Sequence, residues 1–457
     1  MNDLARSALE IVQSRYDDYL DQLGEFITIP SISINPDYGD ETKRAGEWMA
    51  ERLKALHPSR LEVFPTPRYP VVFADLPADD PNLPTVMIYG HYDVMDVEPL
   101  DEWDTGPFSM ERKGDYVFGR GTSDMKGQIM ACLAAVEALQ SAGQLPLHLK
   151  FLMEGEEESS PNHLDQVLAE NRELFACDVC LNPDAGMAGP DTPTIVYGLR
   201  GHVVGILRLQ GPASDLHSGM YGGVVANPLH VLSGLIARFH DDHGRIAIPG
   251  FYEDVVEISE EERARLAELP HSDEAYIQTT GVPKLWGEEG YSAFERVTVR
   301  PSLNVVYIKG GSMKSAVPSK AEAGIGVRVV PHQKPETIFN SLERFFEVSI
   351  PDTVTWEFER RGKCSAVLMD VDSPWVEAMQ SALESTWGKP PILDRIGGSL
   401  PVASDLRNEL GVESILTGFS LPGDNIHGPN EHLHLPTWKK GIQALIDFLS
   451  RSYAHVK

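Results

Sequence analysis

The chain has 457 residues and a formal net charge of −29 at pH 7. Such an excess of acidic groups disfavours binding to nucleic acid or to an anionic membrane, because those partners are held by basic stripes. The sequence begins without a cationic and apolar leader and has no run of about 18 apolar residues, so we expect a soluble, cytoplasmic protein.

The order of predicted elements indicates two domains. Alternating strand and helix patterns fill residues 1–201, which predicts an α/β domain with an open sheet. Residues 202–366 have their own strands, at 202–210, 302–308 and 323–330, and an amphipathic helix at 228–239. We therefore expect one domain formed by 1–201 and 367–457, and a smaller α+β domain, 202–366, inserted into it.

Acidic or imidazole side chains follow four strand-like runs of the first domain. The runs are 85–89, 147–153, 178–181 and 414–419, and the side chains that follow them are His91 with Asp93, Glu157 with Glu158, Asp184, and His427. In an open α/β sheet, ligands bind beyond the carboxyl ends of the strands. These segments, although far apart in the sequence, are therefore expected to converge on one cleft.

Asp124 differs from these residues because it precedes a helix. An apolar stripe at helical spacing follows it, formed by Ile129, Met130, Leu133, Val136 and Leu139. Taken singly, each of these features has a simpler interpretation. Asp124 would be a helix cap, the acids at 154–158 would form a solvated turn, and His427 would be a surface histidine. Taken together they indicate a metal site, because clustered carboxylates repel one another unless a cation neutralises them.

Six stretches of the sequence resemble a known family. Tyr-Gly-His-Tyr-Asp-Val at 89–94, Gly-Arg-Gly-Thr-Ser-Asp-Met-Lys-Gly at 119–127 and Glu-Gly-Glu-Glu-Glu-Ser at 154–159 resemble the signatures of the M20 co-catalytic metallopeptidases. The stretches 197–201, 215–223 and 397–399 are similar to the carnosinase and cytosolic non-specific dipeptidase branch. The resemblance extends from about residue 26 to the C-terminus.

This resemblance implies a fold and a metal centre. The first domain would be a zinc-peptidase-like catalytic domain with a central mixed sheet flanked by helices, and the insert would be a lid and dimerisation domain. Two divalent ions per subunit, Zn²⁺ or Mn²⁺, are expected as cofactors. Asp124 would bridge them, with His91 and Asp184 on one ion and Glu158 and His427 on the other. The family also has a cis peptide at the position of Asp124-Met125.

The resemblance further assigns catalytic roles. A metal-activated water would attack the amide carbonyl, with Glu157 as the general base. Asp93 would hydrogen-bond the His91 imidazole and fix its tautomer. His217 would reach the active site of a neighbouring subunit, which implies a homodimer. For His217 the residues alone favour a glycine-rich turn with a local hydrogen bond.

Substrate-binding residues are expected in the inserted domain and near residue 398. Arg328 would receive the free α-carboxylate of a small peptide, because a guanidinium matches a carboxylate with two parallel hydrogen bonds. Ser315, Gly398 and Ser399 would add hydrogen bonds. The alternative for Arg328 is an outward position on an alternating strand, in a surface ion pair.

The implied activity is cleavage of dipeptides or small peptides with a free C-terminal carboxylate. Two alternatives stay open: an amidohydrolase that deacylates N-acyl amino acids, and a catalytically silent member that binds ligand or metal. The sequence departs from the branch pattern at Glu156, an extra acid, and at Ser160-Pro161. The region 365–372 also matches poorly, and no functional residue is assigned there.

Overall fold

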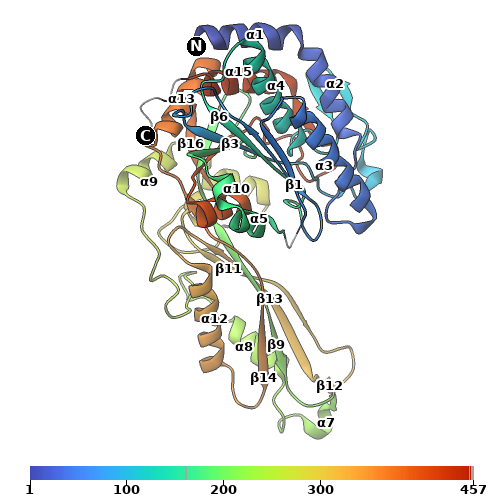
Figure 1. The fold of residues 1–457 in the computed structure, drawn as a ribbon. Helices are drawn as coiled ribbons and strands as arrows, with labels where there is room; N and C mark the ends of the chain where they lie inside the picture. The colour runs from blue at the N-terminus through green and yellow to red at the C-terminus, as the bar shows by residue number, and fades with distance from the viewer. Residues whose placement is uncertain (160–161, 452, 454–457) are drawn as a thin grey trace. The chain divides into compact units, whose positions relative to one another are not determined.

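A computed structural model of the protein describes residues 1–159, 162–451 and 453 (Figure 1). Ser160 and Pro161, where the sequence departs from the family pattern, lie outside the described residues. The chain forms two compact units. Unit 1 comprises Met1–Tyr197, Met369–Leu393 and Asp405–Lys457, and unit 2 comprises Gly198–Leu368 and Asp394–Ser404.

Unit 1 is built around a mixed sheet, as predicted. The strand order is β1-β2-β6-β3-β7-β17-β8-β15, and β16 also pairs with β8. Neighbours within β6-β3-β7-β17 are parallel, whereas β1, β2, β8 and β15 run antiparallel to their neighbours. The strands are β1 (Arg60–Phe64), β2 (Val71–Leu76), β3 (Thr85–His91), β6 (His148–Glu154), β7 (Val179–Asn182), β8 (Thr194–Leu199), β15 (Val367–Leu368), β16 (Ile392–Ile396) and β17 (Ser414–Leu416). Of these, β15 is part of unit 2.

The four parallel strands place their carboxyl ends at one edge of the sheet. In β3 every residue after Thr85 is buried, as expected for a parallel strand that is covered on both faces. His91 at the end of β3 is the register partner of Glu154 at the end of β6, and Leu416 of β17 pairs with Asn182 of β7. The polar segments that follow these strands therefore begin side by side.

Helices cover the sheet of unit 1 (Figure 1). Among them, α4 packs on β3, α3 packs on β1 and β2, and α1, α2 and α15 pack against α4. The helical segments of unit 1 are α1 (Asp3–Ser14), α2 (Tyr16–Ile27), η1 (Pro36–Tyr38), α3 (Gly39–Lys54), η2 (Leu100–Glu102), α4 (Lys126–Ala142), α5 (Leu164–Glu170), α6 (Arg172–Phe175), α13 (Pro374–Trp387), η3 (Leu406–Leu410) and α15 (Leu435–Leu449). All but the last residue of α14 (Pro401–Asp405) belongs to unit 2.

The approach of α4 to β3 depends on Gly90. A Cβ atom at this position would lie 2.6 Å from Cγ1 of Ile129, which is closer than real Cβ contacts. Since Gly90 precedes His91 and Ile129 lies in the first turns of α4, this close packing brings the end of β3 next to the loop that carries Asp124.

A second, three-stranded sheet in unit 1 joins distant parts of the chain. It has the order β18-β5-β4 and consists of β4 (Glu111–Lys113), β5 (Tyr116–Phe118) and β18 (His432–His434). Pairing of His432 with Phe118 places the segment before β18 beside the segment after β5. Residues near 427–431 and near 119–124 are thereby brought together.

Unit 2 contains a four-stranded antiparallel sheet of order β11-β13-β9-β14. The predicted strands and helix are present as β9 (Gly201–Gln210), β11 (Ser302–Gly310), β13 (Lys320–Val329) and α8 (Pro228–Ile236), together with β14 (Thr355–Cys364) and α12 (Pro335–Ser349). In β9 alternate residues are buried, as expected for a sheet with one face packed on a core.

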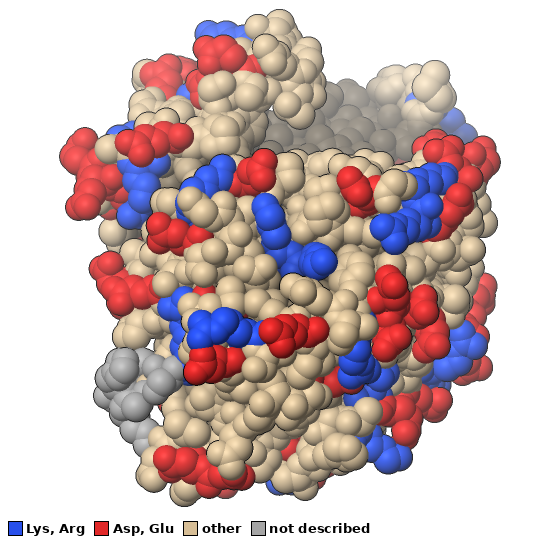
Figure 2. All heavy atoms as spheres, turned by 90° about the horizontal axis from the view of Figure 1, so that it is seen from above, with Lys and Arg blue, Asp and Glu red and all other residues tan. Residues whose placement is uncertain are grey.

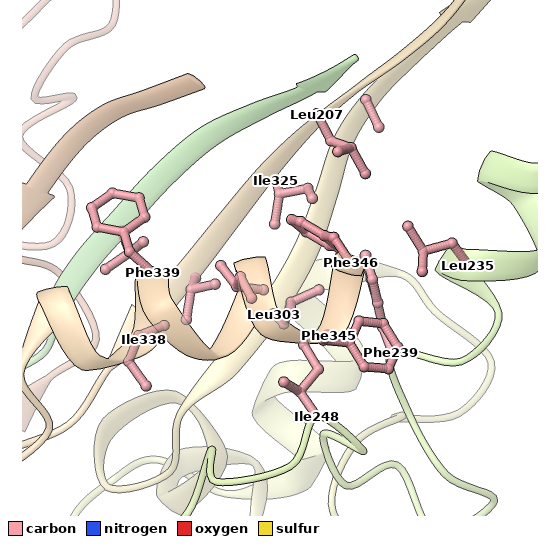
Figure 3. Close-up of a cluster of buried hydrophobic side chains, with 14 of the residues drawn as sticks. Leu207, Leu235, Phe239, Ile248, Leu303, Ile325, Ile338, Phe339, Phe345 and Phe346 are labelled. Atoms are coloured by element: carbon pink, nitrogen blue, oxygen red, sulfur yellow. The ribbon is translucent and has the colours of Figure 1, made fainter. Parts of the chain in front are cut away.

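The core of unit 2 lies between this sheet and its helices. Side chains from α8, α12 and the strands point toward one another there, including Leu207, Leu235, Ile325, Phe345 and Phe346 (Figure 3). Each large apolar side chain buried in this way stabilises a fold by about 1.5–3 kcal/mol. Unit 2 therefore has an apolar core of its own.

Smaller elements complete unit 2. They are β10 (Leu216–His217), α7 (Ser218–Tyr221), α9 (Glu260–Ala267), α10 (Asp273–Thr280), α11 (Ala293–Thr298) and β12 (Ala316–Val317). Ser259 caps α9, because its hydroxyl accepts a hydrogen bond from the main-chain N–H of Glu262. Leu266, Phe294 and Val299 form a satellite core under this region.

Charged side chains are mixed on the surface. On the face shown in Figure 2, Lys and Arg side chains lie among Asp and Glu side chains. Pairs within one helix add to this mixing, such as Arg44 and Glu41 of α3 at 2.8 Å. None of the helices in the described part of the chain has both the length and the apolar character that a membrane crossing requires.

Candidate metal centre

His91, the last residue of β3, has a completely buried side chain. Its Nδ1 atom lies 3.1 Å from the main-chain oxygen of Asp93 and 3.5 Å from the Asp93 carboxylate. The main-chain oxygen is the closer of the two, and the Asp93 carboxylate that the resemblance assigns to His91 also lies near Nδ1. A proton on Nδ1 leaves Nε2 as the donor atom for a cation. Nε2 lies 3.1 Å from Asp124 Oδ1 and 3.7 Å from Asp184 Oδ2.

Asp124 presents its two carboxylate oxygens to two different histidines. Oδ1 faces His91, and Oδ2 lies 3.0 Å from Nε2 of His427. Helix α4 begins at Lys126 with Met125 at the N-cap position, and no side chain caps it. Asp124 is therefore not the helix cap that its sequence position allowed. The Asp124-Met125 peptide is cis, as the resemblance implies.

The remaining predicted donors complete two groups around Asp124. His91, Asp124 and Asp184 form one group, and Asp124, Glu158 and His427 form the other. Within each group the potential ligand atoms lie within 4.8 Å of one another. Asp124 belongs to both groups. Strand exits and the loop before α4 thus bring together side chains that are more than 300 residues apart in the sequence.

The pKa shifts of the side chains in these two groups indicate that acidic charge is in excess. Burial raises the pKa of Glu158 to about 7 and also raises the pKa of Asp184. Hydrogen bonds to Asp124 and Glu158 raise the pKa of His427 to about 10. Burial opposes a charged His91, but the nearby Asp184 and Asp124 raise its pKa all the same. Glu158 and Asp184 therefore bind protons more readily than exposed acids do, whereas at Asp124 burial is outweighed by hydrogen bonds to His427 and His91, which lower the pKa of Asp124.

The donor set fits divalent cations. Nε2 of His427 lies 3.0 Å from Asp124 Oδ2 and 3.2 Å from Glu158 Oε1, yet one ring nitrogen carries a single proton. The buried Glu158 Oε1 accordingly has no hydrogen bond of standard geometry. A cation would satisfy these oxygens at once. Imidazole and carboxylate donors without a thiolate suit Zn²⁺ or Mn²⁺.

Glu157 lies beside the two groups without belonging to either. Burial raises its pKa well above the ordinary value, and the negative charges of Asp184 and Glu158 act in the same direction. The main-chain N–H groups of Glu157 and Glu158 donate to the two carboxylate oxygens of Asp93, at 3.3 and 3.0 Å. Asp93 therefore holds the loop that presents both glutamates.

Glu431 was not found by sequence reasoning, although its contacts order the Asp124 loop. Its buried carboxylate accepts hydrogen bonds from the main-chain N–H groups of Gly121, Ser123 and Asp124 at 2.9–3.0 Å. It also pairs with the guanidinium of Arg120 at 2.8 Å. The one signal in the sequence was an acid four residues after His427, and nothing local shows which backbone it would bind.

His217 and Ser315 come together in unit 2. The short strands β10 and β12 pair His217 with Ala316, and the hydroxyls of Ser218 and Ser315 lie 2.9 Å apart. His217 is exposed, and its Nδ1 accepts a hydrogen bond from the main-chain N–H of Gly219 at 3.1 Å. The local hydrogen bond of a glycine-rich turn is thus present, and a role for His217 in a second subunit stays a prediction.

Arg328 and Ser399 also meet in unit 2. Arg328 Nη1 donates to Ser399 Oγ at 3.0 Å, and Gly398 is the preceding residue. Among the residues that the structure describes, Arg328 is half-buried and has no ion-pair partner. The alternative of a surface ion pair is therefore not observed, and Arg328 is available to an anion from outside the chain.

Glu156, the extra acid of the glutamate run, is buried and fully bonded. Its carboxylate accepts a hydrogen bond from the main-chain N–H of Tyr69 at 2.9 Å and another from the Thr66 hydroxyl. His163 Nδ1 lies 2.5 Å from its other oxygen. Glu156 therefore fastens the loop that carries Glu157 to the segment before β2.

We expect replacement of Glu156 by alanine to lower the free energy of unfolding by about 1–3 kcal/mol, because buried donors would lose their acceptor. Glu156→Gln keeps an oxygen for the N–H of Tyr69 and should lose less. Urea unfolding of both variants measures the difference. If the alanine and glutamine variants unfold at the same urea concentration as the wild type, Glu156 has no such role.

Comparisons with known proteins agree with this geometry. A Cys-Gly metallodipeptidase of Candida albicans is 27% identical over 94% of each chain. The Beta-Ala-His dipeptidase of Homo sapiens is 25% identical over 97% of this chain and 92% of its own.

Solved structures share the fold over nearly the whole chain. An M20 family metallo-carboxypeptidase from Sulfolobus solfataricus matches with a TM-score of 0.84 and 29% identity, covering 94% of this chain and 98% of its own. Human carnosine dipeptidase 1 matches with a TM-score of 0.80 and 24% identity over 98% of each chain. The family model of peptidase family M20/M25/M40 matches residues 87–451. The chain therefore belongs to this family and is a metallopeptidase.

Proposed function

We propose that the protein hydrolyses the amide bond of dipeptides, or of other small peptides that have a free C-terminal carboxylate. The observation that carries this proposal is the position of Asp124 between two donor groups, with Glu157 held beside them by Asp93. A binding protein has no need of a separate, half-buried carboxylate at this point, whereas a hydrolase needs one to move a proton.

The relatives support a peptide substrate. Relatives that match this chain over almost their whole length include proteins named Cys-Gly metallodipeptidase and Beta-Ala-His dipeptidase, and a similar structure is a metallo-carboxypeptidase. A dipeptide and the substrate of a carboxypeptidase have one feature in common: the residue after the cleaved bond has a free carboxylate. Arg328, half-buried and without an acidic partner among the described residues, suits that carboxylate.

In the proposed mechanism the chain's own residues hold the ions and move one proton. His91, Asp124 and Asp184 would hold one divalent cation, and Asp124, Glu158 and His427 the other. When bound, such cations polarise a carbonyl group and make water acidic enough to react near neutral pH. A carboxylate oxygen of Glu157 takes the proton of the attacking water and then delivers it to the leaving amine.

We propose two ions per subunit because there are two donor groups. Either Zn²⁺ or Mn²⁺ suits their imidazole and carboxylate donors, since neither group contains a thiolate that would select between the metals. A homodimer with His217 acting on the partner's substrate is proposed from the family resemblance. The exposed position of His217 is compatible with it. Cytoplasmic location stays a prediction.

A substrate panel tests the proposed function. The metal-loaded full chain is incubated with Ala-Ala, β-Ala-His, Cys-Gly, the amide of Ala-Ala, and N-acetyl amino acids, each with Mn²⁺ or Zn²⁺. We expect turnover of the dipeptides and little turnover of the amide. Hydrolysis of N-acetyl amino acids alone would instead identify a deacylase. Inactivity on every substrate at full metal occupancy would identify a silent binding member.

The role of His217 is tested by mixing two variants. His217→Ala should lose most of its turnover and keep its metal, because His217 is not among the proposed ligands. Mixed with Glu157→Gln under conditions that exchange subunits, it should regain roughly a quarter of wild-type activity, since half the dimers would contain one complete site. A mixture that stays as inactive as its components would exclude action between subunits.

A further inference from the structure

A group of four polar side chains in unit 2 includes Arg328, the proposed receptor for the substrate carboxylate. His202 of β9 and Arg328 of β13 are register partners on adjacent strands. Ser399 Oγ lies 3.0 Å from Arg328 Nη1 and 2.8 Å from His202 Nδ1. Arg200, buried, lies two residues before His202. These residues, Arg200, His202, Arg328 and Ser399, are called the arginine cluster below.

The arginine cluster has two guanidinium groups and no acid to neutralise them. Arg200 donates to the main-chain oxygens of Gly397, Arg296 and Arg300, at 3.1–3.3 Å, and Arg328 donates to Ser399. Neither arginine has an ion-pair partner within the described ranges of the chain. An uncompensated pair of positive charges, partly removed from water, is a receptor for an anion.

The hydroxyl of Ser399 has one proton and must serve two neighbours. A guanidinium only donates, so Arg328 uses a lone pair of Ser399 Oγ. The contact of Ser399 Oγ with Nδ1 of His202, at 2.8 Å, can then use the Ser399 proton. This arrangement requires a neutral His202 with its proton on Nε2. Burial lowers the pKa of His202, and the charge of Arg328 lowers it further, so a neutral imidazole is favoured.

We propose that His202 is a positioning residue for substrate recognition: by accepting the Ser399 proton, it holds Ser399 as an acceptor for Arg328 and so fixes the guanidinium that receives the substrate carboxylate. Ser399 then acts chiefly through Arg328. The assignment rests on the proposed function, because that function supplies the carboxylate. A guanidinium fixed in one orientation binds more tightly than a mobile one, since less freedom is lost on binding.

Two substitutions at His202 separate hydrogen bonding from packing. Asparagine retains an acceptor near the position of Nδ1, whereas phenylalanine retains a ring and has no acceptor. In the metal-loaded enzyme we expect His202→Phe to raise KM for a dipeptide about tenfold with kcat within about twofold, and His202→Asn to resemble the wild type. Equal KM values for the two variants, or a loss confined to kcat, would overturn the assignment.

Inhibitor binding tests whether the expected rise of KM in His202→Phe depends on the C-terminal carboxylate of the substrate. A non-hydrolysed dipeptide analogue and its C-terminal amide are compared as competitive inhibitors. The wild type should prefer the acid, and His202→Phe should reduce that preference about tenfold. A wild type that binds acid and amide equally would overturn the proposed function itself. A preserved preference in His202→Phe would overturn only the role of His202.

The hydrogen-bond arrangement has a readout that needs no substrate. With ¹⁵N-labelled histidine, the His202 signals are those lost in His202→Asn. At neutral pH we expect Nδ1 without a proton and Nε2 with one, and a changed Nδ1 shift in Ser399→Ala. A proton on Nδ1, or a signal indifferent to Ser399→Ala, would contradict the proposal even if the kinetic variants behaved as expected.

Discussion

Replacement of Glu157 by glutamine is expected to lower kcat by about 10²–10⁴-fold and to leave metal content unchanged. Glutamine has the same shape but cannot take the proton of the attacking water. The proposed ligands are other residues, and the main-chain N–H that Asp93 accepts is retained. Steady-state kinetics on a dipeptide, with elemental analysis of the same samples, measures both quantities.

Glu156→Gln is the matched control for this variant. It changes the neighbouring buried carboxylate, which bonds to Tyr69, Thr66 and His163 instead of facing the donor groups. We expect the control to keep most of its turnover. If Glu157→Gln turns over substrate as fast as the control, the general base is a different residue.

Replacement of Asp124 by asparagine should have the second large effect, because Asp124 is common to both donor groups. An amide cannot neutralise a cation, and it presents one oxygen where the carboxylate presents two. Metal content should fall from about two ions per chain to fewer than one, with loss of turnover. The main-chain N–H of residue 124 can still donate to Glu431, so the loop should keep its conformation.

Variants of the unshared ligands provide the comparison. Asp184→Asn and Glu158→Gln each change one donor group only. Each is expected to lose about one ion per chain and to retain the other. If Asp124→Asn binds as much metal as these two variants, Asp124 is not shared between the ions.

The convergence of the donors on one edge of the sheet could be predicted from the sequence for a physical reason. The runs that became β3, β6, β7 and β17 are apolar because parallel strands are buried on both faces, and their donors follow at the carboxyl ends. Local pattern was enough to find these strands. The assignment of ligands to particular ions came from the family resemblance.

The contacts that hold the donors in place could not be predicted in the same way. Glu431 binds the main chain of the Asp124 loop from about 300 residues away, and the register of β18 against β5 determines that contact. The carboxylate of Asp93 lies 3.5 Å from Nδ1 of His91, and it also binds the main chain of the glutamate loop, which the sequence did not indicate. Long-range backbone contacts of this kind leave no periodic signal in a sequence.

The most direct test of two ions sharing Asp124 is anomalous scattering from crystals of the metal-loaded protein, collected at the absorption edge of the metal. The account predicts two peaks on either side of the Asp124 carboxylate. One would lie next to His91 and Asp184, and the other next to Glu158 and His427. A single peak, or none under saturating metal, would contradict it.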